Sequence, residues 1–268
     1  MFKRNIVIIS FCCCATVIFG WESYGNENAE SLYDQAKSLY REKAYDKSIV
    51  VSREIIERYP DSEVSVKSGA AIVDCYYKMK DYNLSIEYGN KFLKDHSDHP
   101  FAENVELIVA RSLLSEKQYD EAGSKYKEFI DKHKGSNKLD EAYYFLGHCY
   151  AGPANQSRNK RKLLNQALNC YNMVVNDYPD SVWVHSANHN IGMTYYRLGD
   201  YEQAIVYLKK YINNGKSGKL LGSTLFYLGD CYERLGKIDE AKKLYNRIIT
   251  EMPNTKWEGH AKKALGKI

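Results

Sequence analysis

Residues 188–204 read NHNIGMTYYRLGDYEQA, and residues 225–241 read LFYLGDCYERLGKIDEA. Both stretches contain an aliphatic residue followed by Gly-x-x-Tyr, and in each an alanine follows that glycine by twelve residues, at Ala204 and Ala241. The stretch YYFLGHCY at residues 143–150 repeats the first half of the pattern. Apolar side chains that recur every three to four residues predict amphipathic helices. We therefore expect an internal repeat of paired helices.

Small residues mark this repeat along most of the chain. They are Ser48, Ser85, Ala122, Ala167, Ala204 and Ala241, separated by 37, 37, 45, 37 and 37 residues. Earlier copies are more degenerate, and Val73 stands where later copies have glycine. Small residues let two helix axes approach while larger side chains interlock around them. Because one hairpin cannot bury its apolar stripe alone, the pattern predicts six stacked helical hairpins.

Turn signals separate the expected helices. The turns within hairpins are Leu198-Gly199-Asp200 and Leu235-Gly236-Lys237, and those between hairpins are Tyr59-Pro60-Asp61-Ser62 and Tyr178-Pro179-Asp180-Ser181. Proline cannot continue a helix, and Asp or Ser can cap the next one. These signals place helix ends at the prolines.

The fourth copy carries eight extra residues within 151–166. Gly152 and Pro153 are expected to end its first helix, and the second is expected to begin near Arg158. Loops inserted in repeat arrays often carry specificity. The polar stretch 256–267 is expected to form a short helix that caps the last hairpin.

The pattern of charge and hydrophobicity at the N-terminus indicates an export signal. Lys3 and Arg4 precede an uncharged apolar run from Ile6 to Phe19, which is shorter than the ~20 residues that span a membrane. We expect a signal peptide over residues 1–25, cleaved after Gly25. An uncleaved membrane anchor is one alternative, and a lipid on one of the cysteines is another; these are Cys12, Cys13 and Cys14.

Composition excludes several classes of protein. Hydrophobic residues make up 44% and charged residues 27%, which fits neither a disordered chain nor a polytopic membrane protein. The net charge is 38 − 34 = +4, too small to require a nucleic acid partner. Gly215-Lys216-Ser217 is interpreted as a turn, because Lys210 stands where a phosphate-binding loop requires glycine. No catalytic motif is found, and no cofactor is expected.

Two histidine pairs have a spacing or neighbours that could suit a metal ion. His185 and His189 are spaced i, i+4, and His96 and His99 lie among acidic residues. The sequence places no third or fourth ligand beside either pair. We therefore expect solvated surface histidines and no metal site.

Three cysteines occupy the same position of the repeat, two residues after the glycine equivalent. They are Cys75, Cys149 and Cys231. A buried free thiol in place of a small apolar residue is the simplest interpretation. Cys149 with Cys170, within one hairpin, is the one pairing close enough to consider for a disulfide.

The repeat resembles the tetratricopeptide repeat, a helix–turn–helix unit with Leu-Gly-x-x-Tyr in its first helix. The resemblance covers about residues 29–253 and implies an all-α, right-handed solenoid over 26–268. Its six repeats are placed at 29–62, 66–99, 103–136, 140–181, 185–218 and 222–255, with a capping helix at 256–268. The 37-residue period and the Tyr-Pro-Asp-Ser junctions are similar to two bacterial envelope families. These are the outer-membrane β-barrel assembly lipoprotein and the periplasmic coordinator of the Tol-Pal cell-division system.

Ligands of the tetratricopeptide family usually lie in a groove lined by the first helix of each repeat. The resemblance therefore implies a peptide-binding groove centred on repeats four and five. Its candidate residues are Tyr77, Arg111, Tyr144, His148, His189, Met193, Tyr196, Arg197, Phe226 and Arg234. Tyrosine and arginine dominate binding hot spots, and methionine suits an adaptable surface. The alternative is that these tyrosines pack between repeats.

The resemblance implies an exported, non-catalytic scaffold in the periplasm or at the outer membrane, with a protein or peptide partner and membrane association through the N-terminus. One alternative is an anchored tether in a secretion or polysaccharide-export complex, and another is an accessory domain with metal chemistry at the histidines. The basic stretch Arg158, Lys160, Arg161 and Lys162 is either a solvated helix start or a contact for anionic lipid or an acidic partner.

Overall fold

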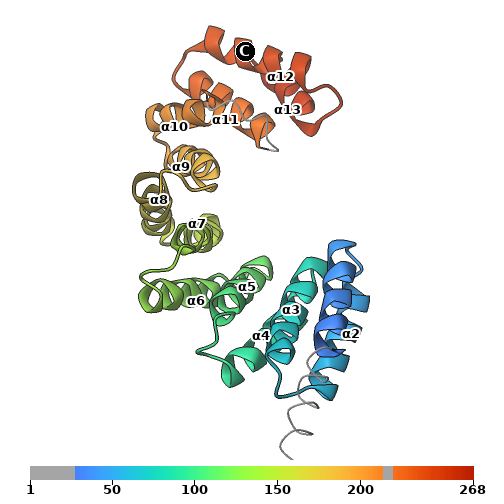
Figure 1. Cartoon of the computed structure of the whole chain (residues 1–268). Coiled ribbons are helices and arrows are strands. Elements are labelled where there is room, and N and C mark those ends of the chain that lie inside the picture. The colour runs from blue at the N-terminus through green and yellow to red at the C-terminus, as the bar shows by residue number, and fades with distance from the viewer. Residues whose placement is uncertain (1–27, 214–219) are drawn as a thin grey trace, which may run out of the picture. The chain divides into compact units, whose positions relative to one another are not determined.

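The computed structural model describes residues 28–213 and 220–268. Helices and short connections make up these residues, with no strand among them (Figure 1). The expected signal peptide at 1–25 and the turn at Gly215-Lys216-Ser217 lie outside the described residues. The chain divides into two compact units between Glu116 and Lys117.

The first unit consists of consecutive helices that pack each against the next (Figure 1). They are a helix over 28–41, α2 (Tyr45–Arg58), α3 (Glu63–Met79), α4 (Tyr82–Asp95) and α5 (Ala102–Ser115). Helix α3 also contacts α5, so the first helices of neighbouring hairpins lie side by side. The observed helices confirm the expected hairpins.

The second unit continues the same alternation and ends with the expected capping helix. Its helices are α6 (Tyr119–Lys132), α7 (Leu139–Ala151), the 3-10 helix η1 (Pro153–Gln156), α8 (Lys160–Asp177), α9 (Val184–Leu198), α10 (Tyr201–Asn213), α11 (Leu221–Arg234), α12 (Ile238–Glu251) and α13 (Lys256–Leu265). Helix α9 contacts α11, and α13 contacts both α11 and α12. The predicted break at Gly152 is confirmed, and α8 begins two residues after the expected Arg158.

Glycine is required where the paired helices of the second unit cross. A Cβ atom on Gly147 would lie 2.5 Å from Cε1 of Tyr171, and one on Gly229 would lie 2.6 Å from Cε1 of Tyr245. Both tyrosines are fully buried, and each follows the small alanine of its helix by four residues. Each large ring of the second helix therefore fills the space that a missing side chain leaves on the first.

In the second hairpin, which belongs to the first unit, the larger residue of the same crossing lies on the first helix. Val73 takes the glycine position, and Gly89 follows Ser85 by four residues. A Cβ on Gly89 would lie 3.4 Å from Cγ1 of Val73 and only 2.3 Å from Cγ2 of Val109. The Ser85 hydroxyl donates to the carbonyl oxygen of Val73 at 3.1 Å. Gly89 therefore leaves room chiefly for Val109 of α5, while Val73 lies at an ordinary contact distance on the facing helix.

Among the described residues, five hairpins have a turn residue with positive φ, and the fourth hairpin has the insertion at this place. Gly199 and Gly236 supply it in the last two hairpins, with φ of 85° and 72°. Lys43, Lys80 and Lys117 occupy the equivalent place in the first three hairpins, with φ of 64°, 65° and 61°. A side chain in this left-handed region is disfavoured by about 1–2 kcal/mol relative to ordinary conformations.

The junctions between hairpins behave as the sequence predicts. Helix α2 ends at Arg58, before Pro60, and α8 ends at Asp177, before Pro179. The Ser62 hydroxyl caps α3 by accepting from the backbone N–H of Ser65 at 3.1 Å.

Candidate functional site

Arg197 of α9 holds the insertion of the fourth hairpin against the rest of the second unit. Its guanidinium donates to the carbonyl oxygen of Ala151 at 2.8 Å and to Oδ1 of Asn155 at 3.1 and 3.2 Å. Burial lowers the pKa of Arg197. Ala154 is fully buried, and Gly152 lies so close to the Tyr119 ring that a Cβ there would be 2.3 Å from it. The insertion is therefore a fixed part of the surface, and Arg197 is engaged in holding it.

Tyr144 and His148 of α7 belong to a polar contact between first helices. The Asn190 amide of α9 donates to the Tyr144 hydroxyl at 3.1 Å, and it lies 3.1 Å from Nε2 of His148. Tyr144 is buried and stacks on Trp183 at 4.7 Å between ring centroids. Burial lowers the pKa of His148 to about 4, so the ring is neutral near pH 7. Tyr144 is a packing residue, and the half-buried His148 is bound to Asn190.

His189 is also engaged between first helices. Its Nδ1 lies 2.8 Å from Oγ1 of Thr224 on α11. Because that hydroxyl donates its proton to the carbonyl oxygen of Leu220, Nδ1 of His189 is the donor to Thr224. Burial, with a smaller contribution from His185, lowers the pKa of His189 to about 4.

The expectation of solvated histidines at 185 and 189 is wrong. His189 is buried, and the His185 ring stacks on Tyr211 at 4.0 Å between ring centroids. The apolar packing around them was not visible in the i, i+4 spacing. Within residues 28–213 and 220–268, no group of three His, Cys, Asp or Glu side chains is arranged to hold a metal ion.

An exposed arginine on α11 is fixed by an aromatic clamp. Nε of Arg234 donates to Oδ2 of Asp230 at 2.6 Å, and this bond raises the pKa of Arg234. The guanidinium carbon lies 5.6 Å from the ring centroid of Tyr196 and 5.3 Å from that of Tyr201. Its Nη1 donates to the Tyr201 hydroxyl at 3.2 Å. We call Arg234, Asp230, Tyr196 and Tyr201 the arginine clamp.

Met193 and Phe226 lie beside the arginine clamp. Both are half-buried and pack, together with Tyr196, against the apolar core shared by α10, α11 and α12. The Phe226 ring also contacts Trp257 of α13 at 5.8 Å between centroids. The structure thus gathers Met193, Tyr196, Phe226 and Arg234 near the C-terminal hairpins of the second unit. Tyr201 was not among the predicted residues, because it begins the second helix and the groove expectation considered first helices alone.

Tyr77 and Arg111 lie together in the first unit. The guanidinium carbon of Arg111 on α5 is 5.1 Å from the ring centroid of Tyr77 on α3. Both side chains are half-buried. Arg111 follows Tyr77 by 34 residues, the same offset that separates Tyr196 from Asp230 and Tyr40 from its hydrogen-bond partner Asp74. This repeated offset is the sequence signal that marks partners on neighbouring first helices.

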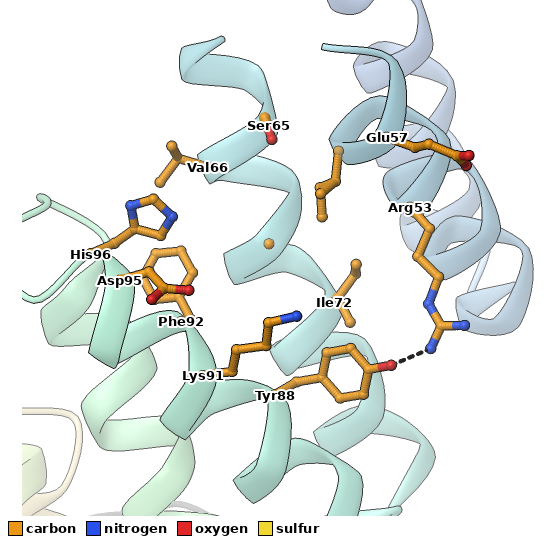
Figure 2. Close-up of a pocket in the computed structure, with 12 residues that line it drawn as sticks. Arg53, Glu57, Ser65, Val66, Ile72, Tyr88, Lys91, Phe92, Asp95 and His96 are labelled. Carbon is orange, nitrogen blue, oxygen red and sulfur yellow. Dashed lines mark hydrogen bonds between the residues drawn. The ribbon is translucent and has the colours of Figure 1, made fainter. Parts of the chain in front are cut away.

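A pocket of about 470 Å³ opens on the first unit between α2, α3 and α4 (Figure 2). Its wall includes the apolar side chains of Ile72 and Phe92, and Figure 2 shows Lys91 directed into it. Arg53 at its rim donates to the hydroxyls of Tyr76 and Tyr88 at 2.7 and 2.6 Å. Such a site can take an apolar side chain that lies next to a carboxylate. Second helices supply part of the pocket wall. The prediction of a groove lined by first helices therefore did not include this pocket.

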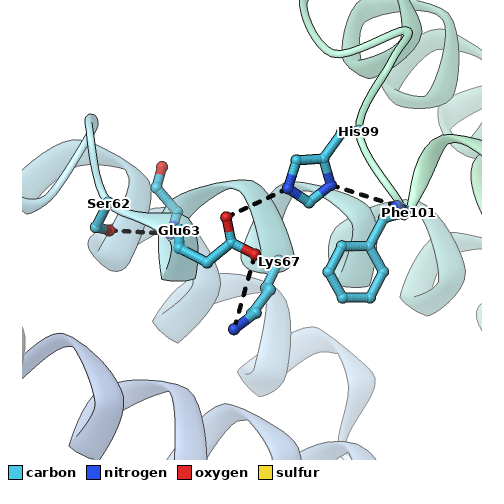
Figure 3. A network of polar contacts seen from close by, with 6 residues as sticks. Ser62, Glu63, Lys67, His99 and Phe101 are labelled. Carbon is cyan, nitrogen blue, oxygen red and sulfur yellow. Dashed lines mark hydrogen bonds and ion pairs between the residues drawn. The ribbon is translucent and has the colours of Figure 1, made fainter.

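His99 connects the start of α3 to the loop before α5 (Figure 3). Its Nε2 lies 3.3 Å from Oε2 of Glu63, and its Nδ1 accepts from the backbone N–H of Phe101 at 3.3 Å. Lys67 lies 3.9 Å from the other oxygen of Glu63. The neighbouring His96 lines the pocket. His99 is therefore a structural tie between two hairpins.

Cys75, Cys149 and Cys231 are buried free thiols, as expected for their shared position in the repeat. Cys170 is also a buried free thiol. Burial raises the pKa of Cys75 to about 11 and that of the other three to about 12. Because thiolate is the reactive form, these thiols are poor nucleophiles near pH 7. Cys149 and Cys170 form no disulfide.

None of the helices in the described ranges has the length and apolar character needed to span a membrane.

Helical hairpins with small residues at their crossings, repeated at intervals of 37 residues and once of 45, define a tetratricopeptide-type repeat protein. A tetratricopeptide repeat family matches residues 183–250. The YfiO family, described as outer membrane lipoprotein, matches residues 26–105 and 96–210, and the chain belongs to this family.

Two curated relatives carry the same name, outer membrane protein assembly factor BamD. The protein of Rickettsia prowazekii is 24% identical over 196 residues, covering 68% of this chain and 78% of the relative. That of Caulobacter vibrioides is 22% identical over 192 residues, covering 66% of this chain. The match spans 62% of the Caulobacter relative, which is less than two thirds of its length.

The fold is shared with solved structures of low sequence identity. The crystal structure of PilW, a widely conserved type IV pilus biogenesis factor, superposes with a TM-score of 0.67 at 15% identity. The superposition covers 88% of this chain and 98% of PilW. The tetratricopeptide solenoid predicted from the sequence is therefore confirmed.

Proposed function

We propose that this protein is an exported, non-catalytic scaffold that serves the assembly of outer-membrane proteins in a bacterial cell envelope. The observation that carries the proposal is the match of the outer membrane lipoprotein family along residues 26–210. The two relatives named as outer membrane protein assembly factors support assembly over the Tol-Pal role. The apolar run at Ile6–Phe19 supports export.

The arginine clamp is the part of the proposed groove best suited to grip a partner protein. Arginine and tyrosine are the residues that most often dominate interface energies. Arg234 is exposed, yet its position is already fixed by Asp230 and two tyrosine hydroxyls. A partner carboxylate that binds it therefore loses little side-chain entropy on the scaffold side.

The other candidate residues divide by their contacts. Met193 and Phe226 add half-buried apolar surface beside the clamp. Tyr144, His148 and His189 set the spacing of first helices rather than contact a partner directly. In the second unit the proposed groove is formed by Met193, Tyr196, Phe226 and Arg234, with the arginine clamp as its centre and with Tyr144, His148, His189 and Arg197 as supporting residues. Tyr77 and Arg111 are proposed separately as a contact surface of the first unit.

Depletion of the protein in its own bacterium tests the assembly role. Under the proposal, depletion lowers the amount of heat-modifiable, folded β-barrel protein in the outer membrane, and the wild-type chain restores it. Cells that form unseparated chains while barrel levels stay normal would instead indicate the Tol-Pal role and overturn the proposal.

A matched pair of variants tests the clamp in the same cells. Arg234→Gln removes the exposed cation of α11, whereas Arg247→Gln removes an equivalent arginine of α12 that also pairs with an acid four residues away. We expect Arg234→Gln to impair restoration of barrel levels and Arg247→Gln to leave it intact. Equal behaviour of the two variants at equal protein levels would exclude the clamp as a partner contact.

Mass spectrometry of the protein purified from envelopes tests its export. Cleavage near Gly25 indicates a signal peptide, and an added acyl mass on a cysteine indicates a lipid anchor. An intact N-terminus on protein found inside the cytoplasm would contradict export.

A further inference from the structure

One exposed segment of the chain carries a dense positive charge. Residues 142–176 contain no Asp or Glu, yet they include the four cations Arg158, Lys160, Arg161 and Lys162. These four lie within five consecutive positions of the insertion in the fourth hairpin. Residues 203–229 also hold four lysines and no acid, but there the lysines are spread from position 209 to position 219.

The structure leaves these four side chains exposed to solvent. They pair with no acidic side chain among the residues that the structure describes, and the first turn of α8 holds no acid. Lysine and arginine are unfavourable in the first turn of a helix, where the helix dipole is positive. Folding alone therefore gives no reason to gather four cations here.

The cations surround the end of the helix rather than line one side of it. Lys160, Arg161 and Lys162 are the first three residues of α8. Successive residues of a helix are rotated by about 100° and rise by only about 1.5 Å. A peptide lying along the helix would meet one of these side chains, whereas a flat charged surface facing the helix end can meet all of them.

The segment that precedes the four cations is held in place by hydrogen bonds and packing. The preceding residues 151–156 are fixed by the two hydrogen-bonded partners of Arg197, by the buried Ala154 and by the contact of Gly152 with Tyr119. The start of α8 is therefore presented in one position, and binding does not have to order the insertion.

We propose that the start of α8 is a docking surface for the anionic headgroups of a lipid bilayer, separate from the arginine clamp and from the N-terminal apolar run. Clustered lysine and arginine bind anionic bilayers electrostatically, each contributing about 1 kcal/mol near the surface. The four exposed cations supply clustered positive charge, which suits an anionic headgroup layer. Docking through α8 sets which side of the second unit faces the membrane.

Vesicle flotation of the full chain tests this proposal. Binding to phosphatidylcholine vesicles is compared with binding to vesicles that also contain phosphatidylglycerol, so that any contribution of Ile6–Phe19 appears in both. The test variant changes all four cations to glutamine, R158Q, K160Q, R161Q and K162Q. The control variant changes four other exposed lysines of the second unit, K134Q, K243Q, K263Q and K267Q.

We expect the wild-type chain to prefer the anionic vesicles, and the test variant to lose about tenfold or more of that preference. The control variant has the same net charge as the test variant and should retain most of the preference. Added salt should weaken binding of the wild type to anionic vesicles.

Three results would overturn the proposal. One is equal binding of the wild type to both vesicle types, and another is an equal loss in the test and control variants. The third is unchanged vesicle binding by the test variant together with lost cross-linking to an acidic envelope protein, which would assign the cluster to a protein partner. None of these depends on barrel assembly, so they are distinguishable from failure of the proposed function.

Discussion

The two units build the same helix crossing with different residues. In the second unit, Gly147 receives the Tyr171 ring, and glycines at 199 and 236 join Lys117 as the αL turn residues. In the first unit, Val73 faces Gly89, and lysines occupy the αL positions. The large side chain at a crossing can therefore come from either helix of the hairpin. Four experiments test this contrast.

The largest effect is expected from Tyr171→Ala, which empties the crossing of the fourth hairpin. Tyr171 is 1% exposed, and truncating a fully buried aromatic ring costs about 3–5 kcal/mol. Urea unfolding followed by tryptophan fluorescence measures the loss, since Trp183 and Trp257 both lie in the second unit. Val182→Ala is the control, because Val182 is 83% exposed and should shift the midpoint little. A small effect of Tyr171→Ala would mean that neighbours collapse into the space.

Acid should destabilise the second unit through His148 and His189. Burial lowers the pKa of each to about 4 from an ordinary 6.5, so the unfolded chain binds more protons between these values. Their contribution to stability is complete above pH 6.5 and is lost as the pH falls toward 4. From about pH 6.5 to about pH 5, each histidine should remove about 2 kcal/mol.

Unfolding midpoints across this pH range measure the acid effect. His148→Gln and His189→Gln should each flatten the pH dependence, whatever their stability at neutral pH. Identical stability of the wild type at both ends of the range would show that these rings take up protons in the folded state without cost.

Adding one methyl group should have opposite effects at two buried glycines. A Cβ on Gly147 meets the Tyr171 ring at 2.5 Å, and overpacking of this kind costs about 1–3 kcal/mol. A Cβ on Gly123 meets its nearest neighbour at an ordinary 3.6 Å, so Gly123→Ala should gain up to about 1 kcal/mol of helix propensity. Unfolding midpoints of the two variants give the signs. Two destabilised variants would contradict the contrast.

The smallest effect is expected at the turn of the second hairpin. Lys80 has a φ of 65°, so Lys80→Gly should stabilise the first unit by up to about 1 kcal/mol. Lys78→Gly, two residues earlier inside α3, should instead destabilise it by about 1 kcal/mol. Circular dichroism during urea unfolding reports both variants. A loss of stability in Lys80→Gly would indicate that its side chain makes a compensating contact.

The hairpins were predictable because small residues recur at a fixed interval and prolines mark the junctions. Helix ends at Arg58, Ala151 and Asp177 followed from the adjacent turn residues. The exchange of Val73 and Gly89 was not predicted, because it needs knowledge of which residue faces which across the crossing. Lysine at an αL position carries no sequence signal of its own.

The candidate site was less predictable, because position within a repeat does not determine what a long side chain contacts. Arg197 reaches Asn155, which is 42 residues away inside an insertion that no repeat pattern covers. Tyr144 and His189 are large enough to fill the space between first helices and so are buried. The side chain of Arg234 is exposed, as a groove residue should be, because Asp230, one turn earlier on the same helix, holds its guanidinium at the surface.

Helix α13 lies where the first helix of another hairpin would begin, and its Trp257 rests on Gly222 so closely that a Cβ there would be 2.2 Å away. The indole therefore fills the space on α11 into which the first helix of a further hairpin would pack. An engineer who wished to lengthen the array would have to delete α13 before grafting new hairpins.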